Sequence, residues 1–149
     1  MTPDEFLNIV RRHERYVNGW VGGAREDLSH QELSGLRLAN VILQKAQLRG
    51  IDFSDCDLTG ADLFRARFER AASPATNFSD ADLRGARFAG AMLSGSHFCG
   101  ADMRPGLSSP ETREFDNTDL NDATLDRAKL EKARLPAGRH FETRDIDRR

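Results

Sequence analysis

A large apolar residue occupies every fifth position over most of this chain, and this spacing constrains the fold more than any other feature. Between residues 28 and 103 the only exception is Ser73. Neither an α-helix, with 3.6 residues per turn, nor a strand, with a repeat of two, keeps one face apolar at a period of five. The chain must therefore turn once in each five-residue unit (a pentad), and the turns must stack into a solenoid. The series is Leu28, Leu33, Leu38, Leu43, Leu48, Phe53, Leu58, Leu63, Phe68, Ser73, Phe78, Leu83, Phe88, Leu93, Phe98 and Met103.

The positions around each large residue follow the same period. A small residue lies two positions before it in most pentads, and Asp or Asn often lies between the two, as in the Ala-Asp-Leu segments 61–63 and 81–83. Gly or Asp recurs two positions after it, for example at Gly60 and Gly85. Gly, Asn and Asp tolerate positive φ or turn geometry. Each pentad is therefore predicted to send one large and one small side chain inward and to spend its other residues on a turn.

The motif A-[DN]-L-x-x resembles the repeat of the pentapeptide-repeat family, over roughly residues 26–137. The resemblance implies an all-β fold, a right-handed quadrilateral β-helix in which four pentads form a coil and each pentad forms one wall. It implies about five coils here, each rising about 4.8 Å, the distance between paired strands. Residues twenty apart are then expected to stack on one wall. The first wall would carry Leu28, Leu48, Phe68 and Phe88, and the second would carry Leu33, Phe53, Ser73 and Leu93.

Three segments are predicted: an N-terminal helical cap over residues 1–25, the β-helix over 26–137 with a loop at 104–112, and a C-terminal tail over 138–149. The tail is polar, with Phe141 and Ile146 as its apolar anchors. It is expected either to cap the last coil or to fray.

The N-terminal segment reads as a helix over residues 2–18. Thr2 is the expected N-cap, and Glu5 stands at the capping-box position. A solenoid needs its first coil covered, because open strand edges and exposed core invite aggregation. The helix and Trp20 are predicted to form that cover. The helix, Trp20 and the following Gly22-Gly23 also look like the leader of bacterial and phage members of the family.

The loop sets the register of everything after it. Residues 104–112 contain two prolines, a glycine and two serines, and the apolar series then resumes two residues out of phase at Phe115. Either seven residues loop out and Phe115 continues the first wall, or two extra residues bulge and Phe115 falls on the second. The first register is preferred, because Phe115 would then extend an aromatic column above Phe68 and Phe88.

Composition adds few constraints on function. Hydrophobic content is 38%, which suits a solenoid in which two residues of five face inward, and the net charge of −2 dictates no strongly charged partner. Cys56 is expected at an inward position and Cys99 at an outward one, so no disulfide is predicted. No apolar run is long enough for a signal peptide or a membrane span. A cytoplasmic protein is expected.

The most distinctive surface predicted is an acidic strip. In the preferred register the second wall carries no Lys or Arg but does carry Glu32, Asp52, Asp55, Asp119 and Asp122. An acidic strip on a straight rod can imitate the phosphate row of duplex DNA. The resemblance implies the same, since some pentapeptide-repeat proteins resemble DNA and bind type II topoisomerases, which underlies quinolone resistance. These five residues are therefore predicted to bind a nucleic-acid-binding protein, such as gyrase or a phage or host defence effector, which the protein would inhibit or modulate.

The alternative is a protein–protein interaction scaffold without mimicry, on which the acidic residues are ordinary solvated surface. No nucleophile, base and orienting group can be named together, so an enzyme is not expected. No cofactor or metal site is predicted. The expected partner is a protein rather than nucleic acid or a membrane, and the expected state is a monomer or an end-to-end homodimer.

Overall fold

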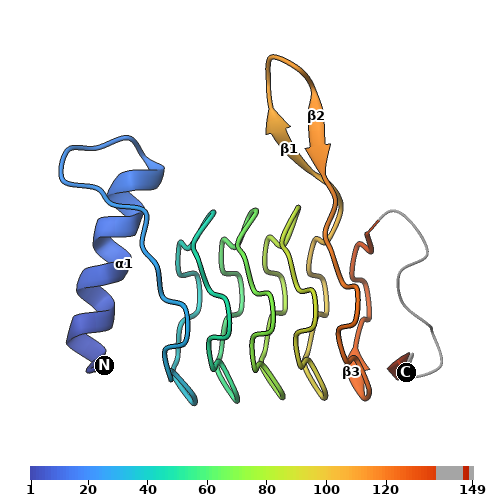
Figure 1. Cartoon of the computed structure of the whole chain (residues 1–149). Coiled ribbons are helices and arrows are strands. Elements are labelled where there is room, and N and C mark those ends of the chain that lie inside the picture. The colour runs from blue at the N-terminus through green and yellow to red at the C-terminus, as the bar shows by residue number, and fades with distance from the viewer. Residues whose placement is uncertain (137–145, 148–149) are drawn as a thin grey trace.

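The computed structural model describes residues 1–136 and 146–147 of the chain. Helix α1 (Pro3–Val17) comes first, and a row of stacked coils follows it (Figure 1). A hairpin of β1 (Gly106–Ser109) and β2 (Glu114–Asp116) projects from one edge of the row, and β3 (Ala128–Lys129) pairs in parallel with β4 (Ile146–Asp147) near its far end. The chain is thus a β-helix with a helix beside its first coil and one long excursion.

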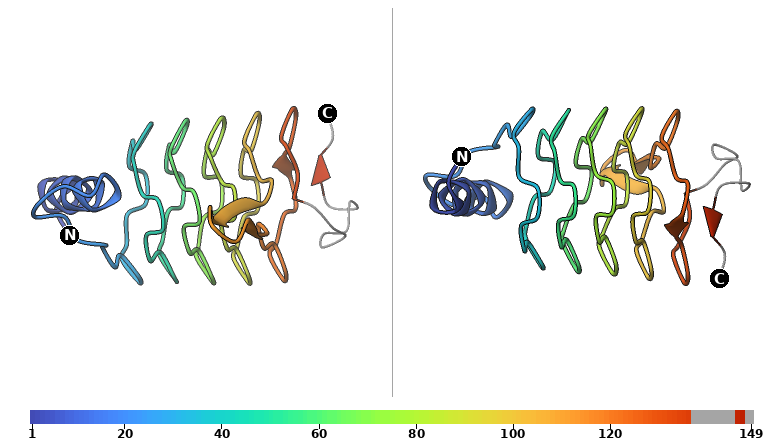
Figure 2. Two further views of the ribbon diagram at one scale, coloured as in Figure 1. Left: turned by 90° about the horizontal axis from the view of Figure 1, so that it is seen from above. Right: turned by 90° about the horizontal axis from the view of Figure 1, so that it is seen from below.

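Backbone pairing between residues twenty apart defines the coils. Parallel bridges join Asp27 to Gln47 and Glu32 to Asp52, and the same spacing holds on the other two sides of each coil. Each side is a wall, numbered here by its first large residue: wall 1 from Leu28, wall 2 from Leu33, wall 3 from Leu38 and wall 4 from Leu43. The twenty-residue coil and its four walls follow the predicted pattern, and the views from above and below show the coils as parallel rungs (Figure 2).

Each corner between walls is a four-residue turn. At the corner between walls 4 and 1, the Ala46 N–H donates to the Leu43 carbonyl at 3.1 Å, and Lys45 between them has a φ of 58°. Positive φ at the third residue is the mark of a type II turn, which explains the recurrence of Gly and Asp there. At the same corner two coils later, Gly85 has a φ of 67°, and a Cβ on it would lie 3.2 Å from the Asp116 carbonyl oxygen. Glycine at this position lets the hairpin base approach the coil.

The interior is a set of stacked large side chains. The Phe68 and Phe88 rings stack on wall 1 with centroids 4.7 Å apart, and the Phe78 and Phe98 rings stack on wall 3 at 5.1 Å. All four are fully buried. Burial of rings and aliphatic groups in this column supplies most of the driving force for folding.

Ser73 breaks the column, because it occupies a large-residue position with a small polar side chain. It is fully buried, and its hydroxyl has no hydrogen-bond partner among the described residues. By contrast, the buried Thr76 hydroxyl donates to the Phe53 carbonyl at 2.7 Å, and the Ser96 hydroxyl donates to the Ser73 carbonyl at 2.6 Å. Small inward residues can reach the backbone of the preceding coil, whereas Ser73 does not.

Both predicted registers after the loop are wrong. Arg87 pairs with Asp119, 32 residues further along the chain rather than twenty. The segment that contains the β1–β2 hairpin, called the excursion here, therefore adds twelve residues to this coil. Leu120, not Phe115, therefore continues wall 1 above Phe88, and no third ring joins the Phe68–Phe88 stack. The reason is that the excursion is itself structured, since Leu107 and Phe115 are cross-strand partners in the β1–β2 hairpin. This apolar pair belongs to the hairpin. Because Phe115 lies five residues before Leu120, its position in the sequence looks like one more inward position of the five-residue repeat.

Helix α1 starts with the expected capping box. The Glu5 N–H donates to the Thr2 hydroxyl at 3.2 Å, and the Thr2 N–H donates to the Glu5 carboxylate at 2.6 Å. Phe6 is buried and belongs to the same apolar cluster as Leu28 of the first coil. Trp20, in contrast, is 60% exposed and does not cover the coil as predicted. It lies in the turn that follows the helix rather than on the buried face of the helix.

At the other end, β4 continues wall 3, since Lys129 pairs with His97 on one side and with Asp147 on the other. The predicted anchor Phe141 lies outside the described residues. No helix in the described part of the chain is long and apolar enough to cross a membrane.

Candidate functional site

The acidic strip predicted for wall 2 does not form. Wall 2 pairs Glu32 with Asp52 and then continues through neutral residues to Thr124. Asp119 lies on wall 1 beside Arg87, and Asp122 follows in the same pentad. The twelve-residue excursion moves both aspartates one wall back from the predicted position. Of the predicted partner-binding residues, only Glu32, Asp52 and Asp55 remain together.

Two of the predicted carboxylates also have a local role in the backbone turn. The Asp52 carboxylate accepts the Ser54 N–H at 2.8 Å, and the Asp119 carboxylate accepts the Asn121 N–H at 2.9 Å. Asp57 on wall 3 makes the same contact, and hydrogen bonds from Thr59 lower the pKa of its carboxyl group. Aspartate before the large residue thus closes its own turn. A role of these residues in partner binding stays a prediction.

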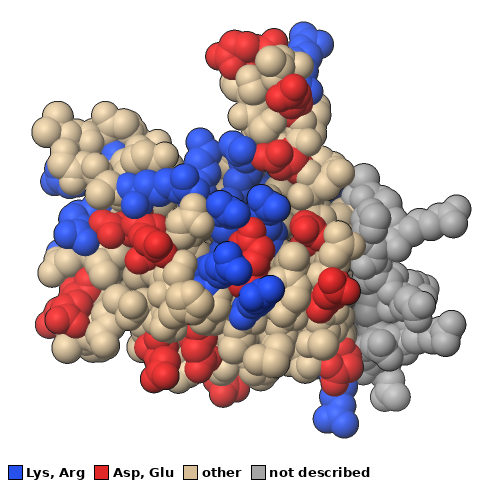
Figure 3. Space-filling view, in the orientation of Figure 1, with Lys and Arg blue, Asp and Glu red and all other residues tan. Residues whose placement is uncertain are grey.

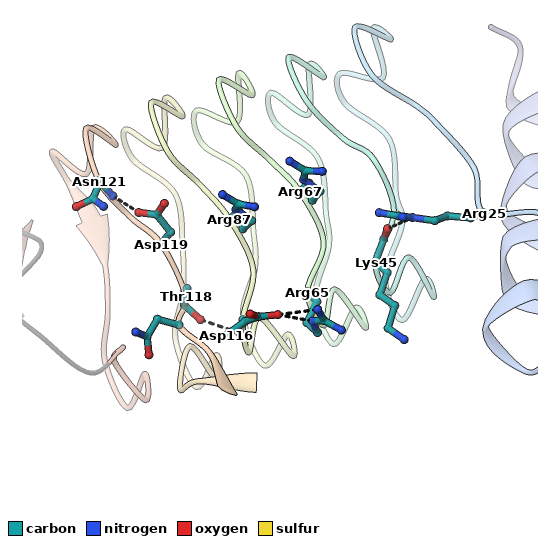
Figure 4. Close-up of a pocket in the computed structure, with 11 residues that line it drawn as sticks. Arg25, Lys45, Arg65, Arg67, Arg87, Asp116, Thr118, Asp119 and Asn121 are labelled. Atoms are coloured by element: carbon teal, nitrogen blue, oxygen red, sulfur yellow. Dashed lines mark hydrogen bonds and ion pairs between the residues drawn. The ribbon is translucent and has the colours of Figure 1, made fainter. Parts of the chain in front are cut away.

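A different group of charged residues, which is mainly basic, lines a groove. This groove, of about 640 Å³, runs along the corner between walls 4 and 1 and ends at the base of the hairpin (Figure 4). We call it the cationic groove. Its lining is Arg25, Lys45, Arg65, Arg67, Gly85, Arg87, Asp116, Asn117, Thr118, Asp119 and Asn121.

The solenoid itself builds the groove from two columns of cations. Arg25, Lys45 and Arg65 are twenty residues apart and occupy the same corner of successive coils. Arg67 and Arg87 are paired neighbours on wall 1 and extend in the same direction (Figure 4). In the space-filling view, Lys and Arg side chains gather between the N-terminal segment and the hairpin (Figure 3).

Some of these cations are neutralised locally and others are not. Arg65 binds Asp116 at 2.7 Å, and Arg67 and Arg87 each lie 3.3 Å from the Glu69 carboxylate. Arg25 and Lys45 have no ion-pair partner among the described residues; the Arg25 side chain donates instead to the Lys45 carbonyl at 2.8 Å. The N-terminal half of the groove therefore carries uncompensated positive charge, while its hairpin end carries both positive and negative side chains.

The hairpin end of the groove is fixed by contacts to the coil below it. The Thr118 hydroxyl donates to the Leu83 carbonyl and accepts the Gly85 N–H, both at 3.0 Å. A Cβ on Gly106 would lie 2.7 Å from the Phe64 ring and 3.0 Å from the Arg84 carbonyl oxygen. Close packing at both strands of the stem, together with the Arg65–Asp116 pair, holds the hairpin upright beside the groove.

Sequence reasoning missed the cationic groove as a whole, since it predicted no basic site. The signal was present, because once four pentads per coil are assumed, Arg25, Lys45 and Arg65 fall on one corner. Asp116 and Asn117 could not be assigned to it, since their position depends on the length of the hairpin.

A family model for pentapeptide repeats matches eight copies of the repeat, over residues 27–71 and 75–104. The chain belongs to the pentapeptide repeat family. The model skips residues 72–74, around Ser73, and ends where the excursion begins. The coil after the hairpin continues the solenoid in space although its sequence falls outside the match.

Several solved structures of pentapeptide repeat proteins are similar to this one. HetL, involved in heterocyst differentiation regulation in Nostoc sp. strain PCC 7120, is 24% identical, with a TM-score of 0.40 over 89% of this chain and 72% of that chain. A protein of the Arabidopsis thaliana thylakoid lumen is 25% identical, with a TM-score of 0.40 over 82% and 87%. QnrB1, a plasmid-mediated fluoroquinolone resistance protein, is 17% identical, with a TM-score of 0.42 over 84% and 63%. No protein with a curated description matches the chain.

Among the described residues there is no group of three or more His, Cys, Asp or Glu side chains placed to hold a metal ion. In the groove, the Thr118 hydroxyl is engaged by backbone groups on both sides and Asp116 by Arg65. The hydroxyl and the carboxylate at the hairpin end of the groove are therefore held by neighbouring groups.

Proposed function

We propose that this pentapeptide repeat protein is a non-catalytic binding protein that offers its rigid coils and its hairpin to a protein partner. One observation carries the proposal. The hairpin projects from the otherwise regular rod with Phe115 61% exposed and its cross-strand partner Leu107 40% exposed. Apolar side chains left this exposed contribute less to the fold than buried ones do, and excursions on rigid scaffolds commonly carry recognition.

The test is a comparison of two variants as bait for proteins of the native host. Leu107→Ser with Phe115→Ser removes the apolar face of the hairpin. Met92→Ser, at a 52% exposed position on wall 2, is the matched control for an exposed apolar residue outside the hairpin. A partner retained by the wild type and by the Met92 variant, but lost by the hairpin variant, supports the proposal. Equal retention by all three proteins contradicts a role for the hairpin.

The DNA-mimic version of the function is the second candidate. It retains the patch of Glu32, Asp52 and Asp55 on the first two coils, where Glu32 and Asp52 are directly paired. This patch does not extend along the rod, so we rank mimicry below scaffolding. Inhibition of gyrase supercoiling by the wild type but not by Asp52→Lys with Asp55→Lys would reverse that order.

We further infer that α1 serves as an end cap of the rod, because Phe6 on its inner face packs with the first coil. The cap keeps the first coil from pairing with another chain, which leaves the walls and the hairpin as the surfaces open to a partner.

A further inference from the structure

The cationic groove lies in a saddle of the molecule. The turn that follows α1 and the β1–β2 hairpin both rise above the same side of the coils (Figure 1). The groove runs along the corner from Arg25, just after this turn, to Asp116 at the base of the hairpin. We propose that this saddle binds an α-helix of the partner protein that carries a row of carboxylates on one face. This inference rests on the proposed function and names the chemistry of the partner.

The dimensions of the saddle favour a helix lying across the rod. From Arg25 to Gly85 the corner advances by three coils, which is about 14 Å at the strand-pairing distance. An α-helix with its side chains is about 10–12 Å wide. Duplex nucleic acid is considerably wider, since its major groove alone accommodates a helix. The floor of the groove, measured along the rod, is therefore long enough for a single helix lying across it.

The spacing of the cations across the rod also matches a helix. Arg65 at the corner and Arg67 on wall 1 are two residues apart, so their Cα atoms are separated by at most about 7 Å. The Cβ atoms at positions i and i+4 of a helix are about 5–6 Å apart, a similar spacing. A helix lying across the rod can thus present one carboxylate to the corner column and the next to the wall column.

The mixed charge at the hairpin end favours a protein over a polyanion. Asp116 and Asp119 line this end beside the amides of Asn117 and Asn121. A uniformly charged phosphate backbone would meet both carboxylates unfavourably. A protein helix can place a neutral or basic residue opposite them, while its acidic residues reach Arg25 and Lys45. Charge of this kind determines which partner is accepted more than how tightly it is held.

The experiment uses the full chain and a fluorescent helical peptide of about twenty residues, rich in Ala, with Glu on one face at i, i+4 spacing. A peptide of the same composition with its Glu residues spread around the helix is the first control. A fluorescent DNA duplex is the second. Anisotropy titrations at low and at physiological salt give the affinities. We expect the one-faced peptide to bind more tightly than either control and to weaken as salt rises, because exposed charges are screened beyond about 8–10 Å.

Two variants test the site itself. Lys45→Glu with Arg67→Glu reverses one cation of each column and leaves the Arg65–Asp116 pair intact. Arg37→Glu with Lys129→Glu makes the same change in net charge on wall 3. The groove variant should bind the peptide at least about tenfold more weakly, and the wall 3 variant should stay within about twofold of the wild type. Circular dichroism melts of both variants check that they are folded.

Three results would overturn the inference: no binding of the one-faced peptide, equal losses in both variants, or tighter binding of the duplex than of the peptide. The hairpin variant described above separates this test from that of the proposed function. If the hairpin is required for partner capture while the peptide does not bind, the protein is a scaffold whose partner does not use the saddle.

Discussion

The two ends of the solenoid differ in how their core is covered. In the first coil Leu28 is fully buried beside α1, whereas Leu135 in the last described pentad is 43% exposed. Both occupy the same kind of inward position in the repeat. The burial of a large inward residue is therefore not decided by its own pentad. It depends on which coils or other segments pack against that pentad on either side along the rod. The difference teaches that position along the rod, and not only membership of the repeat, decides the energetic weight of a core residue.

The largest effect should come from truncating a core residue in the middle of the rod. Leu63 is fully buried between neighbouring coils, so Leu63→Ala should cost about 2–5 kcal/mol of unfolding free energy, through lost burial and the cavity left behind. Leu135→Ala, the same chemical change at the exposed end, should cost less than about 1 kcal/mol. Urea titrations followed by circular dichroism measure both. Similar losses for the two variants would show that the ends of the rod are as well packed as its middle.

A second prediction tests whether α1 protects its end of the rod. Phe6 is 2% exposed and packs with the first coil, while its neighbour Leu7 is 48% exposed on the outer face of the helix. Phe6→Ala should cost about 3 kcal/mol, and Leu7→Ala should stay within about 0.5 kcal/mol of the wild type. Size-exclusion chromatography should in addition show association of the Phe6 variant, because a loosened cap exposes strand edges. A stable, monomeric Phe6 variant would argue against the cap.

The contrast between local and distant information explains how much of this structure could be predicted from the sequence. Period, inward positions and turns depend on each pentad alone, and the glycine at position 85 or the aspartate at 57 has the same meaning wherever it stands. The register after residue 104 depends instead on the length of an excursion, and the Leu107–Phe115 pair of the hairpin imitates the repeat. Because the length of the excursion was misjudged, the prediction placed Asp119 on wall 2 instead of wall 1, and the predicted acidic strip is absent. The corner column of cations needed only the twenty-residue coil and could have been identified.

A third prediction concerns the one polar residue in the column of large side chains. The Ser73 hydroxyl is buried without a partner, and an unsatisfied buried hydroxyl costs about 1–3 kcal/mol. Ser73→Ala removes this cost while keeping the backbone carbonyl that accepts the Ser96 hydroxyl. The variant should gain about 1 kcal/mol. Thr76→Ser is the control, because it keeps a hydroxyl that can donate to the Phe53 carbonyl. If Ser73→Ala lowers the urea midpoint, the hydroxyl has a stabilising role that its surroundings do not show.

The smallest effect predicted is a dependence of the N-terminal end on pH, through His13. This residue is fully buried and joins α1 to the first coil. Its Nδ1 atom accepts the Glu26 N–H at 3.1 Å, so the proton must sit on Nε2, which donates to the Gln44 carbonyl at 2.6 Å. Burial lowers the pKa of His13 below its ordinary value near 6.5, because the charged form is poorly solvated there.

The direction of the pH effect follows from that tautomer. A proton on Nδ1 would remove the acceptor of the Glu26 N–H, so the folded state holds His13 neutral while the unfolded state takes up a proton below about pH 6.5. The contribution of His13 to stability is therefore complete above pH 6.5 and is lost as the pH falls below that value. His13→Gln keeps a donor for the Gln44 carbonyl but does not titrate. The urea midpoint of the wild type should fall more steeply between pH 7 and pH 5 than that of this variant. Parallel pH profiles would show that the contact between helix and coil does not depend on the protonation of His13, and the N-terminal end would then be held by Phe6 and its apolar neighbours alone.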